Sequence, residues 1–210
     1  MSEINRIFAS VNIKSTIKDV RFDSEQQRFV FDFEHDGTGD IVSLTGDGYQ
    51  VEAFGKCFYY GYEFGDEVDG NVRSAFIKYV KFTERLQDDP NLTQFIQKAV
   101  NNLNSRINLY DYDLVVMPQS SSRVNNYMLR YIYRFEQPKL RHYEDVLANP
   151  ADEELCRTIR EQNVLVIDDV TTSGSTLGEV LRTLRILNED NRISIFSLIG
   201  RRDLMADVTP

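Results

Sequence analysis

The sequence predicts an α/β protein in which a parallel sheet with flanking helices follows an N-terminal β-rich segment. Apolar and polar residues alternate in the first third of the chain, which is the pattern of half-buried strands. Short apolar runs then alternate with helical patterns, which favours parallel strands connected by helices. One such run, residues 164–167, leads directly into two carboxylates and a hydroxyl-rich loop. We therefore divide the chain into a β-rich segment, residues 1–66, and an α/β domain, residues 67–210.

The β-rich segment is expected to form an antiparallel meander. Phenylalanines at every second position mark its clearest strand, and Asp-Gly pairs mark its turns. The expected strands cover residues 20–22, 29–33, 49–54 and 57–64, with turn signals at residues 36–37 and 47–48.

The α/β domain is expected to alternate helix and strand. Its helices are predicted from apolar residues at helical spacing and its strands from short apolar runs. The helices are expected at 71–86, 92–105, 124–135 and from 177 onward, with a short one at 152–161. The strands are expected at 112–117, from 164 to the acidic pair at 168–169, and at 193–199. Ligands in parallel sheets bind at the carboxyl ends of the strands, so the loops at 118–123 and 168–176 are expected at one edge.

The stretch from residue 164 to residue 177 contains the most specific motif of the chain. A buried strand ends at Asp168 and Asp169, and a loop rich in Thr and Ser leads into a helix. Helix starts with free N–H groups bind anions, and Gly174 lets the backbone approach a phosphate closely. Carboxylates repel phosphate, so the acidic pair must serve another part of the same ligand. Paired hydroxyls of a ribose 5-phosphate fit that description. A strand-turn-helix with a capping hydroxyl is the alternative, but a cap requires no acidic pair.

The motif resembles the PRPP-binding signature of type I phosphoribosyltransferases. The resemblance implies a phosphoribosyltransferase-type α/β core in which Asp168 and Asp169 hold the ribose hydroxyls. It also implies transfer of the 5-phosphoribosyl group from PRPP to a nitrogen acceptor, with Mg²⁺ bound through PRPP near the acidic pair. The expected phosphate-binding residues are Thr171, Thr172, Ser173, Gly174, Ser175 and Thr176.

A second polar loop occupies the position of the family's pyrophosphate loop. It follows the strand 112–117 and Pro118, and its candidate ligands for diphosphate are Ser120, Ser121, Ser122 and Arg123. Hydroxyl groups and a guanidinium fork suit an anion. Capping of the next helix by Ser122 and a solvated Arg123 are the alternatives. The preceding helix pair is weakly similar to the ComF-like branch of the family, and residues 136–150 are a candidate lid.

Composition excludes some classes of function. The net charge of −9 argues against general nucleic-acid binding. No apolar run approaches the roughly 20 residues of a membrane helix, and the first residues have no apolar signal-peptide core. The two cysteines, Cys57 and Cys156, are far apart, so we expect a reduced, cytoplasmic protein.

Three interpretations of function remain open from the sequence. The first is an active phosphoribosyltransferase acting on a base or an amine. The second is a regulator that binds PRPP or a nucleotide without turnover. The third is a phosphoribosyltransferase-like subunit of a larger assembly, for example a phage-defence complex. A homodimer is also expected from the family resemblance, and the acceptor is not identified by any motif.

Overall fold

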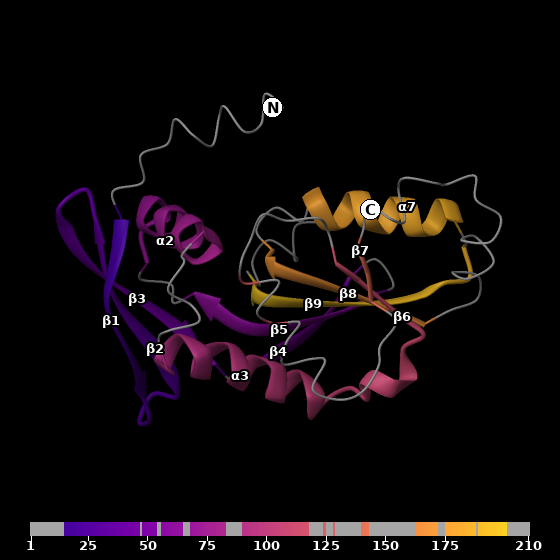
Figure 1. The fold of residues 1–210 in the computed structure, drawn as a ribbon, viewed down its shortest axis with the longest axis horizontal. Helices are drawn as coiled ribbons and strands as arrows, with labels where there is room; N and C mark the ends of the chain where they lie inside the picture. Colours follow the sequence, from indigo (N-terminus) through magenta and orange to yellow (C-terminus); the bar gives the residue numbers. More distant parts are fainter. Residues whose placement is uncertain are drawn as a thin grey trace.

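One continuous mixed sheet of nine strands organises the chain (Figure 1). The structure is a computed structural model that describes residues 15–46, 48–53, 56–64, 68–82, 90–117, 124, 128, 140–142, 163–171, 175–187 and 189–200. The strands are β1 (Ser15–Asp23), β2 (Arg28–His35), β3 (Thr38–Thr45), β4 (Tyr49–Ala53), β5 (Lys56–Phe64), β6 (Leu114–Met117), β7 (Leu140–His142), β8 (Asn163–Val170) and β9 (Arg192–Gly200). The helices are α2 (Gly70–Phe82), α3 (Pro90–Asn104), the 3-10 helix η2 (Leu109–Asp111) and α7 (Ser175–Leu187).

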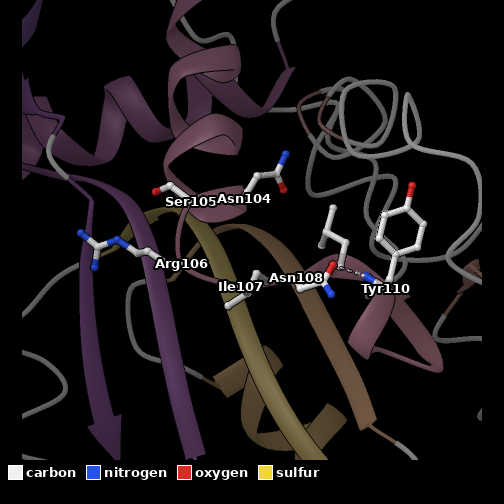
Figure 2. Close-up of a pocket in the computed structure, with 7 residues that line it drawn as sticks. Asn104, Ser105, Arg106, Ile107, Asn108 and Tyr110 are labelled. Atoms are coloured by element: carbon white, nitrogen blue, oxygen red, sulfur yellow. Dashed lines mark hydrogen bonds between the residues drawn. The ribbon is translucent and has the colours of Figure 1, made fainter.

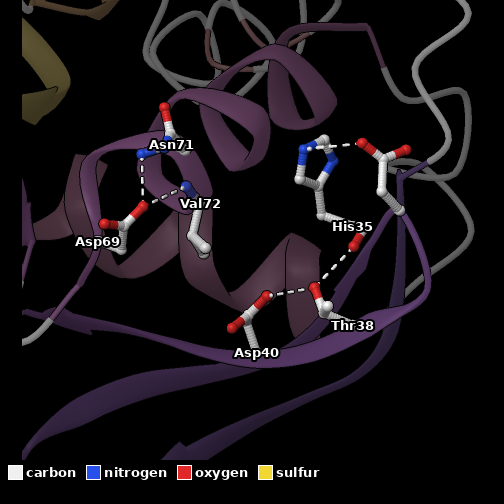
Figure 3. Close-up of polar contacts among 7 residues, drawn as sticks. His35, Thr38, Asp40, Asp69, Asn71 and Val72 are labelled. Carbon is white, nitrogen blue, oxygen red and sulfur yellow. Dashed lines mark hydrogen bonds and ion pairs between the residues drawn. The ribbon is translucent and has the colours of Figure 1, made fainter.

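The first three strands form an antiparallel meander, of which the sequence predicts parts of β1 and β2 but not β3. β2 pairs with β1 on one side and with β3 on the other. Asp36 and Gly37 form the two-residue turn between β2 and β3, with φ angles of 49° and 85°. Positive φ at both positions is the geometry of the hairpin turns whose twist matches that of the strands. Thr38 Oγ1 donates to the carbonyl oxygen of His35 and so closes the turn (Figure 3).

Strand β5 joins this meander to the parallel half of the molecule. It pairs antiparallel with β3 and β4 along one side and parallel with β9 along the other. The remaining pairs, β9 with β8, β8 with β6 and β6 with β7, are also parallel. β5 is therefore an interior strand with neighbours on both sides. Its residues Phe58, Tyr60, Tyr62 and Phe64, at every second position of the strand, are all buried.

The predicted phosphoribosyltransferase-type α/β core is wrong as a fold class. The sheet is mixed, and the described residues contain more strand than helix, with three α-helices. The error has a physical cause. Hydrophobic periodicity identifies a strand but does not identify its hydrogen-bonding partner, so the pairing of β5 with β9 could not be predicted from the local pattern. The proposed division of the chain at residue 66 stays a prediction. The pairing of β5 with β9 joins a strand before this residue to a strand after it.

Helices cover the two faces of the sheet and create two apolar clusters. Residues of α2 and α3 pack with β1, β2, β3 and β5 and extend to Leu165 and Ile167 of β8. Residues of α7 pack on the opposite face, against Val164 and Val166 of the same strand. Figure 1 shows α3 and α7 on opposite sides of the parallel strands. Alternation along β8 therefore sends neighbouring side chains into different clusters.

The described parts of the predicted helices agree with the structure. Asp69 caps α2: its Oδ1 accepts hydrogen bonds from the amides of Asn71 and Val72, at 2.8 and 3.4 Å (Figure 3). Such a cap satisfies N–H groups that the helix itself leaves free. α3 buries one apolar face, as its spacing predicts. Residues 83–86 and 152–161 and all but two residues of the helix predicted at 124–135 lie outside the described residues. None of the described helices is long and apolar enough to span a membrane.

Close approach of α3 to β5 requires a glycine at position 61. A Cβ atom there would lie 2.6 Å from Ala99 Cβ and 2.8 Å from the Leu198 carbonyl oxygen. We expect Gly61→Ala to lower the free energy of unfolding by about 1–3 kcal/mol, because neither neighbour is a flexible side-chain end. The matched control is Gly178→Ala in α7, where a Cβ meets nothing within 4 Å. Urea denaturation should show this control unchanged or more stable by up to about 1 kcal/mol. Equal stability of both variants would contradict the prediction.

Candidate functional site

The acidic pair lies at the carboxyl end of β8, in the interior of the parallel strands. Residues Val164–Ile167 are fully buried, and β8 runs between β6 and β9. β6 ends at Met117 and is followed by the second polar loop, so the two predicted loops leave neighbouring parallel strands in the same direction. The carboxyl ends of β6 and β8 therefore lie at the same edge of the sheet, and the placement of the loops at 118–123 and 172–174 stays a prediction. α7 begins at Ser175, shortly after the pair.

Asp169 is completely buried and forms an ion pair that the sequence analysis missed. Its side chain has a relative exposure of 0%, and Lys81 Nζ donates to its Oδ1 across 2.9 Å. The Val170 amide donates to the same oxygen at 2.6 Å. Among the described residues, the second oxygen, Oδ2, has no hydrogen-bond partner. Buried carboxylate oxygens are normally satisfied, so this oxygen is an acceptor that the described part of the protein leaves open.

The sequence contains only a weak indication that Lys81 belongs to the site. It lies in the last turn of α2, where a basic residue also stabilises the helix dipole, and this location alone explains a lysine. Pairing it with Asp169 required knowledge that α2 packs beside the carboxyl end of β8. Lys81 is 30% exposed, so its ammonium group lies between the buried pair and solvent.

Asp168 has a different environment from Asp169, because adjacent strand residues face opposite sides of a sheet. It is 7% exposed, and its Oδ1 accepts a hydrogen bond from the Asp169 amide at 2.9 Å. Burial, followed by the negative charge of Asp169, raises the pKa of Asp168 from its usual value to about 7. The charge of Lys81 and the amide hydrogen bond act in the opposite direction but are smaller.

The raised pKa of Asp168 predicts a pH-dependent stability. The group prefers its protonated form in the folded state, so its contribution to stability is fully present below the ordinary aspartate pKa of about 4. That contribution is lost as the pH rises through about 7. Asp168→Asn removes the titration, so the stability of the variant relative to the wild type should increase from pH 5 to pH 8. Urea denaturation at both pH values measures this difference, and parallel pH dependence of the two proteins would contradict it.

Thr171 connects the end of β8 to β9. Its amide donates to the Ile199 carbonyl oxygen at 2.9 Å, and its hydroxyl is hydrogen-bonded to the Ser197 hydroxyl. Its side chain is buried, with a relative exposure of 4%. Of the predicted phosphate-binding residues, it is the one whose side chain the structure describes. In the structure its hydroxyl fixes two strands to each other at the start of the loop.

Most other predicted site residues lie outside the described residues. Ser175 and Thr176 form the first turn of α7, and their side chains are not described. Of the candidate lid, residues 140–142 form β7 beside β6. Within the described ranges, no three His, Cys, Asp or Glu side chains form a metal-binding group. The predicted residues outside the description are Thr172, Ser173, Gly174, Ser120, Ser121, Ser122 and Arg123.

A separate cleft of about 460 Å³ lies at the amino end of β6, opposite the end that carries the polar loop. It is lined by residues 104–110, between α3 and η2 (Figure 2). Asn108 caps η2 by accepting a hydrogen bond from the Tyr110 amide at 3.2 Å, and Arg106 donates to the Gly48 carbonyl oxygen at 2.7 Å. These side chains serve the local structure, and no predicted site residue lies in this cleft.

No family model matches this chain, and no curated protein matches it.

Proposed function

We propose that the protein binds PRPP at the carboxyl end of β8 and transfers its 5-phosphoribosyl group to a nitrogen acceptor. One observation carries this proposal. A carboxylate pair ends a buried strand between parallel neighbours and directly precedes the hydroxyl-rich loop and the start of α7. In this arrangement the carboxylates face ring hydroxyls while the loop and the helix start bind the 5-phosphate.

The proposed reaction is a displacement at C1 of the ribose. The bond from C1 to the diphosphate oxygen breaks, and its electron pair leaves with diphosphate. A bond from the acceptor nitrogen to C1 forms, and that nitrogen loses a proton. The contribution of the protein is to position the substrate and to stabilise charge. An ionised Asp169 near C1 would stabilise positive charge that develops on the ring, and the loop at residues 120–123 would hold the diphosphate.

Magnesium fits this proposal as a partner of the substrate. Among the described residues, no group of three or more His, Cys, Asp or Glu side chains could hold a metal ion, and Asp169 is already paired to Lys81. A protein-held magnesium site requires more oxygen ligands than this acidic pair. Mg²⁺ would neutralise charge on the diphosphate, and Asp168 would be its nearest protein carboxylate in the proposed complex.

A second candidate function is binding of PRPP or a nucleotide without turnover, as in a regulator. Its support is the complete burial of Asp169 and its ion pair with Lys81. A carboxylate held in this way serves binding and structural order equally well. Diphosphate release distinguishes the two functions, because only the transferase produces it.

Calorimetric titration of Mg²⁺ with PRPP is the direct test of the pocket. The wild type should bind, and the double variant Asp168→Asn, Asp169→Asn should not. A screen for diphosphate release over bases and amines then separates transferase from regulator. Equal binding by both proteins, or binding by neither, would overturn the assignment of the pair. In the second case, a search for protein partners would test the third interpretation, a subunit of a larger assembly.

The proposal also includes the compartment, the oligomeric state and the acceptor of the protein. Two distant cysteines suit a reducing compartment, so we place the activity in the cytoplasm. A homodimer is part of the same proposal, and light scattering tests it. The acceptor is a base or an amine, which the diphosphate-release screen would identify.

A further inference from the structure

The ion pair between Lys81 and Asp169 connects a helix of one half of the molecule to the site in the other half. α2 packs against the meander strands, and its last turn places Lys81 Nζ 2.9 Å from Asp169 Oδ1. Three donors are available on an ammonium group, and the carboxylate they face is 0% exposed. Among the described residues, this ion pair is the contact between α2 and the acidic pair.

The two oxygens of Asp169 have unequal roles. Oδ1 accepts from Lys81 and from the Val170 amide, while Oδ2 is buried and has no partner among the described residues. A carboxylate with both oxygens free can rotate about its terminal torsion, because such torsions have broad minima. Two donors on Oδ1 remove that freedom and fix the direction of Oδ2.

We propose that Lys81 is a positioning residue that holds Asp169 by Oδ1, so that Oδ2 is a preformed acceptor for a ring hydroxyl of the ligand. This inference rests on the proposed binding of a ribose phosphate. A buried acceptor without a hydrogen-bond donor costs free energy. A ligand hydroxyl that donates to it therefore gains more binding free energy than it would at an exposed carboxylate. Selection for a hydroxylated sugar then depends on Lys81, a residue that itself contacts no sugar atom in this arrangement.

Charge gives a second reason for a lysine at this position. Asp168 and Asp169 are adjacent, and the expected ligand is a polyanion. Two ionised carboxylates would repel each other and the ligand. The positive charge of Lys81 lies 2.9 Å from Asp169 Oδ1 and offsets the negative charge that the ligand would otherwise meet.

The test compares sugar discrimination among lysine variants. Calorimetry measures the affinity of each protein for ribose 5-phosphate and for its 2-deoxy and 3-deoxy analogues. The wild type should prefer ribose 5-phosphate over at least one analogue by about tenfold, the value of one hydrogen bond to a charged group. Lys81→Met should lose most of this preference, and Lys81→Arg should retain it. Lys81→Leu, which likewise removes both the donor and the charge, carries the same test where the Met variant does not fold.

The matched control is Lys78→Met, which removes an exposed lysine one turn earlier on the same helix. Its preference should equal that of the wild type. A lysine with a merely structural role would change stability and leave the ratio of affinities unchanged, so an unchanged ratio in Lys81→Met or Lys81→Leu overturns the proposal. A wild type that binds all three sugars equally also overturns it. A wild type that binds none of the sugars and no PRPP instead refutes the proposed function, and this inference with it.

Discussion

Asp169→Asn should lower PRPP affinity or turnover at least about tenfold. The amide has nearly the same shape as the carboxylate but no charge, so the ion pair with Lys81 is lost and a lysine faces the site without its partner. The open acceptor also changes, because one of the two side-chain oxygens becomes an amide nitrogen that donates hydrogen bonds. Each hydrogen bond to a charged group contributes roughly 1.5–3 kcal/mol, which corresponds to a factor of ten or more. Calorimetry measures the affinity and a diphosphate assay the turnover.

The controls for Asp169→Asn must separate binding from folding. Removing one partner of a buried ion pair commonly costs about 3–5 kcal/mol of stability. Urea denaturation therefore has to show that the variant is folded under the conditions of titration. Asp19→Asn is the matched control, because Asp19 lies on the exposed face of β1 with a surface partner, Arg21, at 3.4 Å. It should bind like the wild type. Unchanged affinity and turnover in a folded Asp169→Asn would exclude a role of this carboxylate in the site.

Local patterns predicted the elements around the candidate site well. The apolar run Val164–Ile167 is buried on both faces, so it has the composition of an interior strand whatever its neighbours are. α7 follows from apolar residues at helical spacing, of which Leu177, Val180 and Leu184 are buried. In both cases the information is contained within about a dozen consecutive residues.

Long-range pairing could not be predicted in the same way. β5 was recognised as a strand, but its parallel pairing with β9 joins residues more than 130 positions apart, and no local pattern encodes it. β3 was not predicted at all, since its first half, Thr38–Ile41, is largely exposed and shows no regular alternation. The partner of Asp169 was missed for the same reason, because Lys81 is 88 positions away from it in the sequence.

Phe95→Ala should lower the free energy of unfolding by about 3–5 kcal/mol. Phe95 is 1% exposed and fixes α3 to the meander. Its ring stacks on Tyr62 with centroids 4.1 Å apart and meets Phe29 and Phe31 edge-on, each at 5.4 Å. The Tyr62 hydroxyl also donates to the Phe95 carbonyl oxygen. Truncation leaves a cavity among rings that cannot collapse into it, because three of them belong to hydrogen-bonded strands.

Thermal and urea unfolding of Phe95→Ala, Phe95→Leu and Tyr110→Ala would show whether the loss of stability comes from this aromatic cluster. Phe95→Leu should cost less than Phe95→Ala, because a branched aliphatic side chain fills part of the cavity. Tyr110→Ala is the exposed control, since Tyr110 is 66% exposed and its removal should change stability by less than about 0.5 kcal/mol. A loss below about 1 kcal/mol in Phe95→Ala would mean that α3 does not pack on the sheet as described. Because Phe95 packs against β2 and β5, a folded Phe95 variant should retain the affinity of the acidic pair for its ligand, which separates the structural role of this cluster from the role of Asp169.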